Sequence, residues 1–351
     1  MDKNSKIFVA GYRGLVGSAI LRKLQALGYA NIVARDRAEL DLRDSEAVNR
    51  FFASQKPEYV FLAAAKVGGI LANNTYKAEF IYDNIAIATN AVDASYRFGV
   101  KKLMNLGSSC IYPRLAPQPL KEEYLLTGPL EPTNEPYAIA KIAAIKLCRY
   151  YNEQYGTNFL SVMPTNLFGP GDNFNLETSH VLPALMRKFH LAKLLNRGHA
   201  KQAIEDIKQR PLGFGLQLGS DTSEPAIEIL LQRIGVTSKY VELWGTGGPL
   251  REFLYVDDLS DAVVFLMMNT DFKDVGEFVN IGSGRDLPIR ELADRIRETV
   301  GFPGEIRFDS SKPDGTPRKL LDTSRMKSLG WEPKTSLDEG LRLTYRWYLE
   351  H

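Results

Sequence analysis

The stretch KIFVAGYRGLVGSAILRKLQAL, residues 6–27, decides the fold of this chain. It opens with a short apolar run that predicts a buried strand, and Ser18–Leu27 carries apolar residues at helical spacing. Gly11, Gly14 and Gly17 lie in the turn between the two. A glycine turn in this place lets the backbone approach a pyrophosphate and points the amino end of the helix at it. The spacing is one position away from Gly-x-Gly-x-x-Gly, so an ordinary strand-to-helix turn stays an alternative.

A second apolar strand, Asn31–Ala34, supports the dinucleotide interpretation because it ends where an adenosine ribose would lie. Arg35-Asp36-Arg37 follows it. An acid at this place usually binds the 2′-hydroxyl of NAD, whereas arginines accept the 2′-phosphate of NADP. Arg13 in the glycine turn adds another guanidinium, so the sequence favours NADP, with the aspartate pairing to an arginine. Asp41 and Leu42 are predicted to border the adenine.

Strands and helices alternate along the first half of the chain. Apolar runs predict strands at 59–63, 102–106 and 160–164, and helical stretches are predicted at 45–54, 80–98 and 138–155. This order predicts an α/β fold with a doubly wound, parallel Rossmann sheet, whose ligand crevice lies at the carboxyl ends of the strands. Four segments follow the carboxyl ends of predicted strands: the glycine turn, Ala63-Ala64-Ala65, Gly107-Ser108-Ser109-Cys110 and Pro164-Thr165-Asn166. We therefore expect these four segments to converge.

Tyr137 and Lys141 form a Tyr-x-x-x-Lys pair, which places the phenol and the ammonium on one face of a helix. A positive charge beside a phenol favours phenolate and lowers a pKa that starts near 10. Such a tyrosine can exchange a proton with a carbinol or carbonyl oxygen, and Ser108 can hold the same oxygen. The pair alone is a weak signal, and its weight comes from the surrounding motifs.

Composition fits a soluble enzyme with two domains. The chain has 351 residues, of which 44% are hydrophobic and 25% charged, which is ordinary for a globular protein. A net charge of +2 gives no reason to expect nucleic acid or a membrane surface as a partner, and no apolar run is long enough for a bilayer. Two cysteines, Cys110 and Cys148, and a polar start without an apolar signal stretch predict a cytoplasmic location. No metal is expected.

Longer motifs are specific enough to indicate a family. They are GYRGLVG (11–17), AAAKVGGI (63–70), GSSCIYP (107–113), EPTNEPYAIAK (131–141), MPTNL (163–167), SH (179–180), WGTG (244–247), REFL (251–254) and KPDGTPRK (312–319). Together they resemble the extended short-chain dehydrogenase/reductase family, which acts on nucleotide sugars, and within it the 3,5-epimerase-4-reductases. The resemblance covers nearly the whole chain. It implies that a homodimer converts GDP-4-keto-6-deoxy-D-mannose to GDP-L-fucose with NADP(H).

The resemblance also implies a catalytic set. Inversion at C3 and C5 of a 4-keto sugar needs a base on one face and an acid on the other, and by resemblance Cys110 is the base and His180 the acid. Tyr137 and Ser108 would stabilise the enolate oxygen. In the reduction, Tyr137 would protonate O4 while Lys141 holds the nicotinamide ribose.

Binding residues follow from the same resemblance. The cofactor set is Gly11, Arg13, Gly14, Leu15, Val16, Gly17, Arg37, Asp41, Leu42, Leu106, Gly107, Lys141, Pro164, Asn166, Leu167 and His180. The substrate set is Ser109, Asn166, Lys188, Trp244, Arg251 and Asp314. Arg251 and Lys188 are candidates for the diphosphate. Two alternatives stay open: Trp244 stacks on guanine or packs in the core, and Asp314 contacts the substrate or forms a plain turn.

Domain boundaries are predicted as follows. Residues 1–170 form the NADP-binding domain, to which 250–275 returns, while 171–249 and 276–351 form the substrate domain. An insertion at about 196–240, absent from shorter members of the family, interrupts the substrate domain. It includes a predicted helix at 226–234 and a loop at 211–219.

Other functions remain open on the same motifs. A nucleotide-sugar 4-epimerase or 4-ketoreductase would use Ser108, Tyr137 and Lys141 without needing Cys110 and His180. A related GDP-deoxy-sugar of the colitose type would need much the same site. A non-catalytic NADP-binding regulator is a third class, which the intact Ser-Tyr-Lys set opposes.

Overall fold

The computed structural model describes residues 1–312 and 314–351, so Pro313 of the KPDGTPRK motif lies outside the described residues. The chain forms two compact units. Unit 1 comprises Met1–Gly171, Glu252–Arg285 and Leu320–Thr335. Unit 2 comprises Asp172–Arg251, Asp286–Lys319 and Ser336–His351. No helix in the described ranges is long and apolar enough to cross a membrane.

Unit 1 is built on a six-stranded sheet with the strand order β2-β1-β3-β4-β5-β9, and all neighbouring strands are parallel. The strands are β1 (Ile7–Ala10), β2 (Ile32–Val33), β3 (Tyr59–Leu62), β4 (Lys102–Leu106), β5 (Phe159–Pro164) and β9 (Val279–Ile281). This topology confirms the predicted doubly wound α/β fold. The sequence analysis did not predict β9, whose three residues are too few for a periodic signal.

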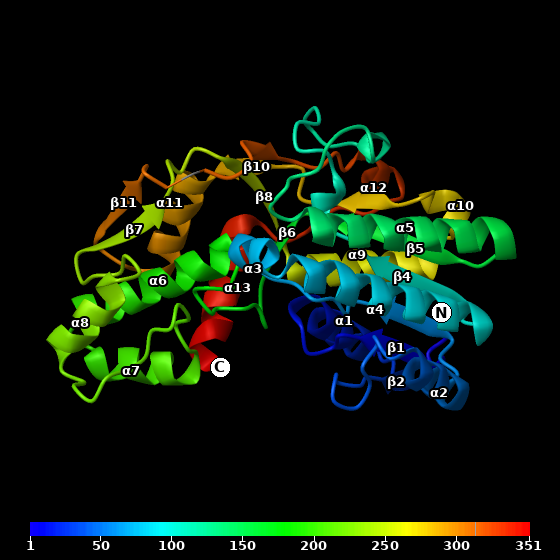
Figure 1. Cartoon of the computed structure of the whole chain (residues 1–351), viewed down its shortest axis with the longest axis horizontal. Coiled ribbons are helices and arrows are strands. Elements are labelled where there is room, and N and C mark those ends of the chain that lie inside the picture. Colours follow the sequence, from blue (N-terminus) through cyan, green and yellow to red (C-terminus); the bar gives the residue numbers. More distant parts are fainter. Residues whose placement is uncertain (313) are drawn as a thin grey trace. The chain divides into compact units, whose positions relative to one another are not determined.

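Helices cover both faces of the sheet (Figure 1). They are α1 (Leu15–Ala26) and α9 (Val256–Asn269) on one face, and α2 (Ser45–Gln55), α4 (Lys77–Arg97) and α5 (Glu135–Tyr155) on the other. Unit 1 is completed by α3 (Ile70–Thr75), η1 (Ser109–Ile111), η2 (Glu122–Tyr124), β6 (Asn166–Phe168), α10 (Phe272–Val275) and α12 (Ser324–Ser328).

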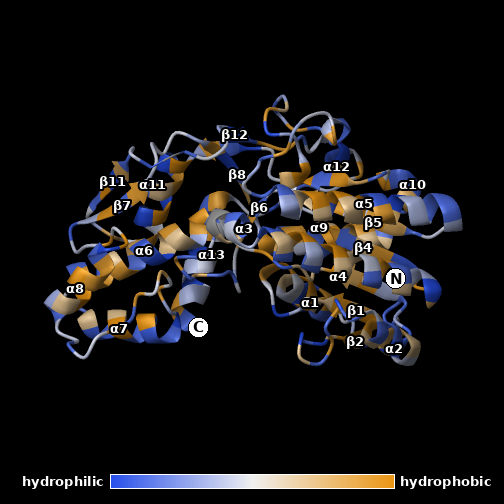
Figure 2. Cartoon of the chain, in the orientation of Figure 1, coloured by the Kyte–Doolittle hydropathy of each residue, from blue (hydrophilic) through white to orange (hydrophobic). Residues whose placement is uncertain are grey.

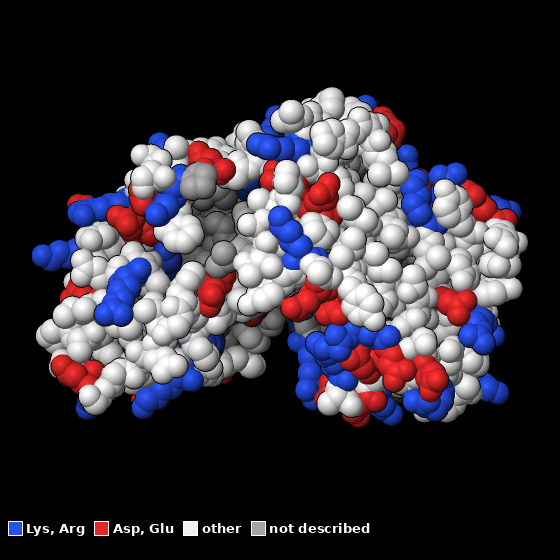
Figure 3. All heavy atoms as spheres, viewed as in Figure 1, with Lys and Arg blue, Asp and Glu red and all other residues white. Residues whose placement is uncertain are grey.

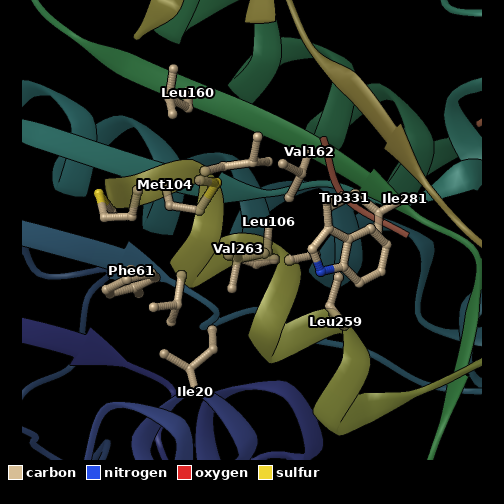
Figure 4. Packing of buried hydrophobic residues seen from close by; sticks show 14 of the residues in the cluster. Ile20, Phe61, Met104, Leu106, Leu160, Val162, Leu259, Val263, Ile281 and Trp331 are labelled. Carbon is tan, nitrogen blue, oxygen red and sulfur yellow. The ribbon is translucent and has the colours of Figure 1, made fainter. Parts of the chain in front are cut away.

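The alternation of side chains along β1 explains this layering. Ile7 and Val9 pack in a cluster with α1 and α9, whereas Phe8 and Ala10 pack in another with α2 and α4. All four are buried, as expected for a parallel strand covered on both faces. Figure 4 shows the first cluster, where Phe61, Met104 and Val263 meet between strands and α9. Figure 2 shows hydrophobic residues concentrated on β1, β4 and β5.

Unit 2 is smaller and mixes helices with short strands. Its helices are α6 (Val181–Asn196), α7 (Ala200–Gln209), α8 (Glu224–Gln232), α11 (Ile289–Val300) and α13 (Leu337–Glu350). Strand β7 (Tyr240–Trp244) pairs with β11 (Glu305–Asp309), and β8 (Leu250–Tyr255) lies between β10 (Asp286–Pro288) and β12 (Arg318–Lys319). Beyond Arg251, β8 continues into unit 1, where it pairs with β6.

Two segments lie in a different unit from the domain predicted for them. Residues 276–285 and 320–335 were assigned to the substrate domain, but they belong to unit 1. The first segment supplies β9 to the sheet, and the second places Trp331 in the cluster with α1 and α9. The Trp331 indole also donates to Asp261 Oδ2 of α9 at 2.9 Å. The buried Trp331, whose N–H is hydrogen-bonded, anchors the second segment to unit 1. The sequence did not predict this because the partners of both segments are distant in sequence.

The glycine turn between β1 and α1 is packed backbone to backbone. Gly11 has a φ of +78°, and a Cβ built on it would lie 2.7 Å from the backbone nitrogen of Ala64. A Cβ on Gly17 would lie 2.1 Å from the carbonyl oxygen of Gly11, whereas one on Gly14 would keep 3.5 Å from the same oxygen. The turn therefore holds the ends of β1 and β3 together only because side chains are absent.

We predict that Gly17→Ala lowers the free energy of unfolding by about 1–3 kcal/mol, because the new methyl group overlaps fixed backbone. Gly14→Ala, in the same turn and at a φ of −79°, should lower the free energy of unfolding clearly less. Urea denaturation of both variants, followed by circular dichroism, measures the difference. Equal shifts of the two midpoints would show that the close approach does not matter.

Candidate functional site

The arginines predicted to read a 2′-phosphate lie at the carboxyl end of β1 and β2. Arg13 is 71% exposed and pairs with Asp36, at 2.9 Å between Nη2 and Oδ2. Arg37, 70% exposed, lies 3.7 Å from Asp41. Figure 3 shows basic and acidic side chains interspersed in this part of unit 1, around β2 and α2. The guanidiniums are exposed enough to accept a phosphate and already have weak carboxylate partners.

Asp36 has a second task in the turn. Its Oδ1 accepts from the backbone N–H groups of Ala38 and Glu39, at 2.9 and 3.0 Å. The carboxylate therefore caps the turn with one oxygen and holds Arg13 with the other. This arrangement agrees with the expectation that the aspartate pairs with an arginine.

Asp41 and Leu42 are held in place by different contacts. Asp41 accepts three hydrogen bonds from the Arg43 guanidinium, and these bonds lower the pKa of the carboxyl to about 2. Arg43 also pairs with Asp83 of α4 at 3.0 Å. Leu42 is buried in the cluster beneath α2, so only its backbone can border a ligand. Both residues are thus fixed by contacts within unit 1.

The segment after β4 brings two predicted catalytic residues together. Ser108 is extended and precedes η1, and its hydroxyl accepts from the backbone N–H of Cys110 at 3.5 Å. Cys110 and Ser109 are both buried. A short 3-10 turn after a strand thus places the thiol two residues beyond the hydroxyl, close to α5.

Tyr137 and Lys141 lie one turn apart on α5, with the ammonium 5.6 Å from the centre of the phenol ring. Lys141 is buried and donates to the backbone oxygen of Leu106 at 2.7 Å. That bond ties α5 to the last residue of β4. The turn that carries Cys110 packs against α5, and the Cys110 charge affects the pKa of both α5 side chains.

The direction of the Tyr137 pKa differs from the sequence expectation. Burial, and secondly the Cys110 charge, raise the pKa of Tyr137 well above its usual value. Burial lowers the pKa of Lys141 to about 8, although the Cys110 charge opposes this. The ammonium is itself desolvated and directed at Leu106, so it does not draw the proton from the phenol. Tyr137 therefore keeps its proton at neutral pH and is set up as a proton donor.

The remaining cofactor candidates follow β4 and β5. A Cβ on Gly107 would lie 2.9 Å from the backbone oxygen of Val162 and would also displace the flexible end of the Met163 side chain, so a larger residue would force a shift at this point. Pro164 ends β5, and Leu167 of β6 packs against the core. Asn166 donates from Nδ2 to the backbone oxygen of Glu252 at 2.8 Å, which fixes its orientation. The four strand ends meet along one edge of the sheet, as the parallel order requires.

His180 belongs to unit 2, where it precedes the first residue of α6. Its side chain is accessible to solvent, yet protein atoms crowd it enough for desolvation, and secondly the Lys319 charge, to lower its pKa. The imidazole is therefore neutral at pH 7. Lys188, two turns further along α6, donates to the backbone oxygen of Glu242 at 3.2 Å, and burial lowers its pKa to about 8.

Three other substrate candidates gather at the end of β7 and the start of β8. Trp244 is 68% exposed, so the alternative that it packs in the core is wrong. Asp314 accepts from the Thr246 backbone N–H at 2.9 Å and from the Thr246 hydroxyl at 2.6 Å. Arg251 donates to the Leu250 backbone oxygen at 2.8 Å, and burial lowers its pKa while Asp314 opposes that shift.

Sequence reasoning missed the carboxyl group beside Arg251. Glu252 is fully buried, and its oxygens accept from the backbone N–H groups of Gly284 and Leu321, at 2.7 and 2.9 Å. Burial raises its pKa. A charged pair, Arg251-Glu252, inside an otherwise largely apolar strand was the available signal. Since Asn166 binds its backbone oxygen, Glu252 anchors the loops around β6.

Comparison with known proteins identifies the family to which this chain is similar. The model described as NAD dependent epimerase/dehydratase family matches residues 7–210 and 215–282. GDP-L-fucose synthase 1 of Arabidopsis thaliana is 53% identical over 350 residues, which cover 100% of this chain and 95% of that protein. GDP-L-fucose synthase of Escherichia coli strain K12 is 48% identical, covering 99% and 97%. A solved GDP-mannoheptose C4 reductase from Campylobacter jejuni with NADP bound is 42% identical, with a TM-score of 0.88 and 99% of both chains covered.

These matches span the nucleotide-binding sheet, the Ser-Tyr-Lys set and unit 2 alike. They agree with a glycine turn between β1 and α1 and with a tyrosine one helical turn before a buried lysine. The chain therefore belongs to the NAD dependent epimerase/dehydratase family, which uses a nicotinamide cofactor, and within it to the group of GDP-L-fucose synthases.

Proposed function

We propose that this chain converts GDP-4-keto-6-deoxy-D-mannose to GDP-L-fucose by epimerisation at C3 and C5 and NADPH-dependent reduction at C4. The observation that carries the proposal is the turn after β4, which packs against α5 and brings the buried Cys110 close to the helix that carries Tyr137 and Lys141. A plain reductase needs the tyrosine and the lysine, but it has no use for a thiol at this place. The full-length identity to proteins named GDP-L-fucose synthase supports the same reaction.

In the epimerisation, Cys110 removes the proton beside the carbonyl and His180 returns one to the opposite face. The charge then develops on the carbonyl oxygen. The Tyr137 hydroxyl, which keeps its proton, and the Ser108 hydroxyl can donate to that oxygen. His180 is neutral at pH 7, so it must collect a proton from solvent before it can act as the acid, and its accessible side chain allows this.

In the reduction, the reduced nicotinamide supplies the hydride for C4 when the cofactor is bound. Tyr137 protonates O4, and its raised pKa keeps that proton available. Lys141 contributes a positive charge next to the phenol and is held in place by Leu106. The turn before the amino end of α1 would hold the pyrophosphate of the cofactor, and Arg13 and Arg37 favour the 2′-phosphate of NADP.

The GDP part of the substrate is assigned to unit 2. Arg251 and Lys188 supply cationic donors for the diphosphate, and Ser109 and Asn166 of unit 1 contact the sugar. The exposed ring of Trp244 can stack on guanine. Asp314 holds the turn after β7 in place by accepting hydrogen bonds from the backbone N–H and the hydroxyl of Thr246.

Two further points belong to the proposal. The chain acts as a homodimer in the cytoplasm. In support of a dimer, α4 and α5 expose several large side chains, namely Tyr82, Tyr96, Ile139, Tyr150 and Tyr155. Buried thiols at Cys110 and Cys148 suit a reducing compartment.

A second candidate function is 4-ketoreduction of a GDP-sugar without epimerisation. It is favoured by one observation, the 42% identity over 99% of the chain to a protein named GDP-mannoheptose C4 reductase. That function would leave Cys110 and His180 without a role.

The direct test is to incubate the protein with GDP-4-keto-6-deoxy-D-mannose and NADPH and to identify the product by NMR. GDP-L-fucose is expected. A product reduced at C4 with C3 and C5 unchanged would favour the second candidate.

We predict that Cys110→Ser and His180→Asn each slow the exchange of the C3 and C5 hydrogens with deuterated water by on the order of 10²–10⁴-fold, because each removes one proton-transfer group. Tyr137→Phe should instead abolish NADPH oxidation. Matched controls are Cys148→Ser, at the other buried cysteine, and His199→Asn, at the residue before α7. Exchange at the parent rate in both test variants would assign Cys110 and His180 structural roles.

A second prediction concerns the cofactor. Arg13→Ala and Arg37→Ala should each weaken NADPH binding by on the order of 10-fold or more and leave NADH binding nearly unchanged, since charge-assisted bonds to the 2′-phosphate are lost. Fluorescence titration measures both affinities. Arg50→Ala, an exposed arginine of α2 paired with Glu46, is the control. Equal losses for both cofactors would mean that these arginines do not read the phosphate.

The pH dependence should separate two lysines. The pKa of Lys141 and that of Lys188 are both lowered to about 8, so both ammonium charges are present below pH 8 and are lost above it. We expect kcat to fall as the pH rises through 8 because of Lys141, and KM to rise because of Lys188. In Lys188→Gln the change in KM should disappear while the fall in kcat stays. A kcat that is flat to pH 9.5 would contradict the role of Lys141.

A further inference from the structure

One face of the two-stranded sheet in unit 2 is open to solvent. Strands β7 and β11 run parallel and side by side (Figure 1), and Trp244 pairs with Asp309 at their carboxyl ends. Val241 and Leu243 of β7 are buried on the inner face. Successive side chains alternate between the two faces of a sheet, so Trp244 lies on the outer face. Asp309, which is paired with it in register, projects from the same side.

The strand ends hold these two residues next to each other. The N–H of Gly245, which follows Trp244, donates to the backbone oxygen of Asp309 at 2.9 Å. Lys312, three residues beyond Asp309, turns back toward the pair: its ammonium lies 6.0 Å from the centre of the Trp244 ring. An aromatic ring, a carboxylate and an ammonium are therefore gathered at one end of this sheet.

The two aromatic rings on this face differ in how they are covered. The Tyr240 ring has the guanidinium of Arg307 3.9 Å from its centre, and Arg307 is held there by Glu305 at 2.9 Å. The Trp244 ring is 68% exposed, and the Lys312 ammonium lies beyond the van der Waals contact distance of about 3.5–4.0 Å. The tyrosine is thus stacked on a partner within the chain, whereas the tryptophan has room for a flat ligand.

The Asp309 carboxylate has a fixed orientation beside the open ring. Its Oδ1 accepts from the backbone N–H and the hydroxyl of Ser311, at 3.0 and 2.6 Å. These bonds lower the pKa of Asp309, so the carboxylate is charged at neutral pH. Within residues 1–312 and 314–351 its Oδ2 accepts no hydrogen bond, and the side chain is half-buried rather than enclosed. That oxygen is available to a ligand.

We propose that Asp309 selects guanine as the base of the substrate, by accepting hydrogen bonds from N1–H and the 2-amino group while the base stacks on Trp244. The inference rests on the proposed function, in which Trp244 contacts the guanine of the GDP-sugar, and it names the residue that gives the site its preference for this base. A carboxylate accepts two parallel N–H bonds, and guanine presents two adjacent donors. Lys312 supplies a donor for O6, the acceptor next to N1.

Other bases match the carboxylate less well. Adenine has an acceptor at N1, which a carboxylate repels, and uracil and hypoxanthine each offer a single N–H at the corresponding edge. A polar site rejects a ligand that leaves its groups unpaired more strongly than an apolar pocket rejects a ligand of the wrong shape. The stacking ring alone would accept any base, so the preference for guanine is assigned to Asp309.

Calorimetry with GDP, inosine diphosphate and xanthosine diphosphate tests this assignment. The parent protein should bind inosine diphosphate, which lacks the 2-amino group, on the order of 10-fold more weakly than GDP. Asp309→Asn should raise the Kd for GDP by on the order of 10-fold and lower the Kd for xanthosine diphosphate by a similar factor. The new amide donates to the 2-carbonyl oxygen of xanthine and still accepts from N1–H. It also keeps an oxygen for Ser311, so the turn is preserved.

A gain in xanthosine diphosphate affinity cannot come from a damaged fold, which makes the exchange of preference the decisive result. Glu305→Gln, at an exposed carboxylate on the same face that pairs with Arg307, is the matched control and should leave all three Kd values unchanged. A loss for GDP without a gain for xanthosine diphosphate, or a parent protein that binds GDP and inosine diphosphate equally, would overturn the assignment and leave the proposed function intact. The predicted exchange of preference in a protein that makes no GDP-L-fucose would overturn the proposed function alone.

Discussion

The hydrogen bond from Lys141 to the backbone oxygen of Leu106 is the constraint on which the catalytic cluster depends. A buried ammonium needs acceptors, and here one of them is the last residue of β4. The bond fixes α5 relative to the strand end. Tyr137 lies one turn before Lys141, and Ser108 and Cys110 follow Leu106 directly, so one contact sets the relative positions of all four groups. The thiol then acts on the pKa of both α5 side chains.

The two roles of Asp36 explain why residues typical of NAD binding and of NADP binding occur together after β2. One aspartate among arginines suggested either NAD or NADP, and sequence alone could not say how its carboxylate was used. In the fold, one oxygen of Asp36 caps the next turn and the other holds Arg13. An exposed ion pair of this kind is worth little, so the guanidinium can leave it for a phosphate of higher charge. The aspartate is thus compatible with NADP.

The sequence predicted the parallel sheet and its ligand edge because these depend on local signals: apolar runs, glycine turns and helical periodicity. It could not predict β9 or the return of residues 320–335, whose places are set by partners distant in sequence. For the same reason, the exposure of Trp244 and the burial of Glu252 became visible only in the fold. The Tyr137 pKa moved opposite to expectation because burial, and secondly the Cys110 charge, raise it, and spacing along the sequence does not reveal burial.

The insertion is better understood as support for the loop before His180 than as a peripheral addition. Arg187 would be costly to bury without partners, yet it binds Asp206 of α7 at 3.0 Å and donates to the backbone oxygens of Phe174, Arg210 and Pro211. Asp206 in turn pairs with Arg210 at 3.2 Å and accepts from the Tyr348 hydroxyl of α13. Removing the insertion would leave the Arg187 charge buried without Asp206. The unpaired charge would then destabilise the loop that precedes His180, the proposed acid.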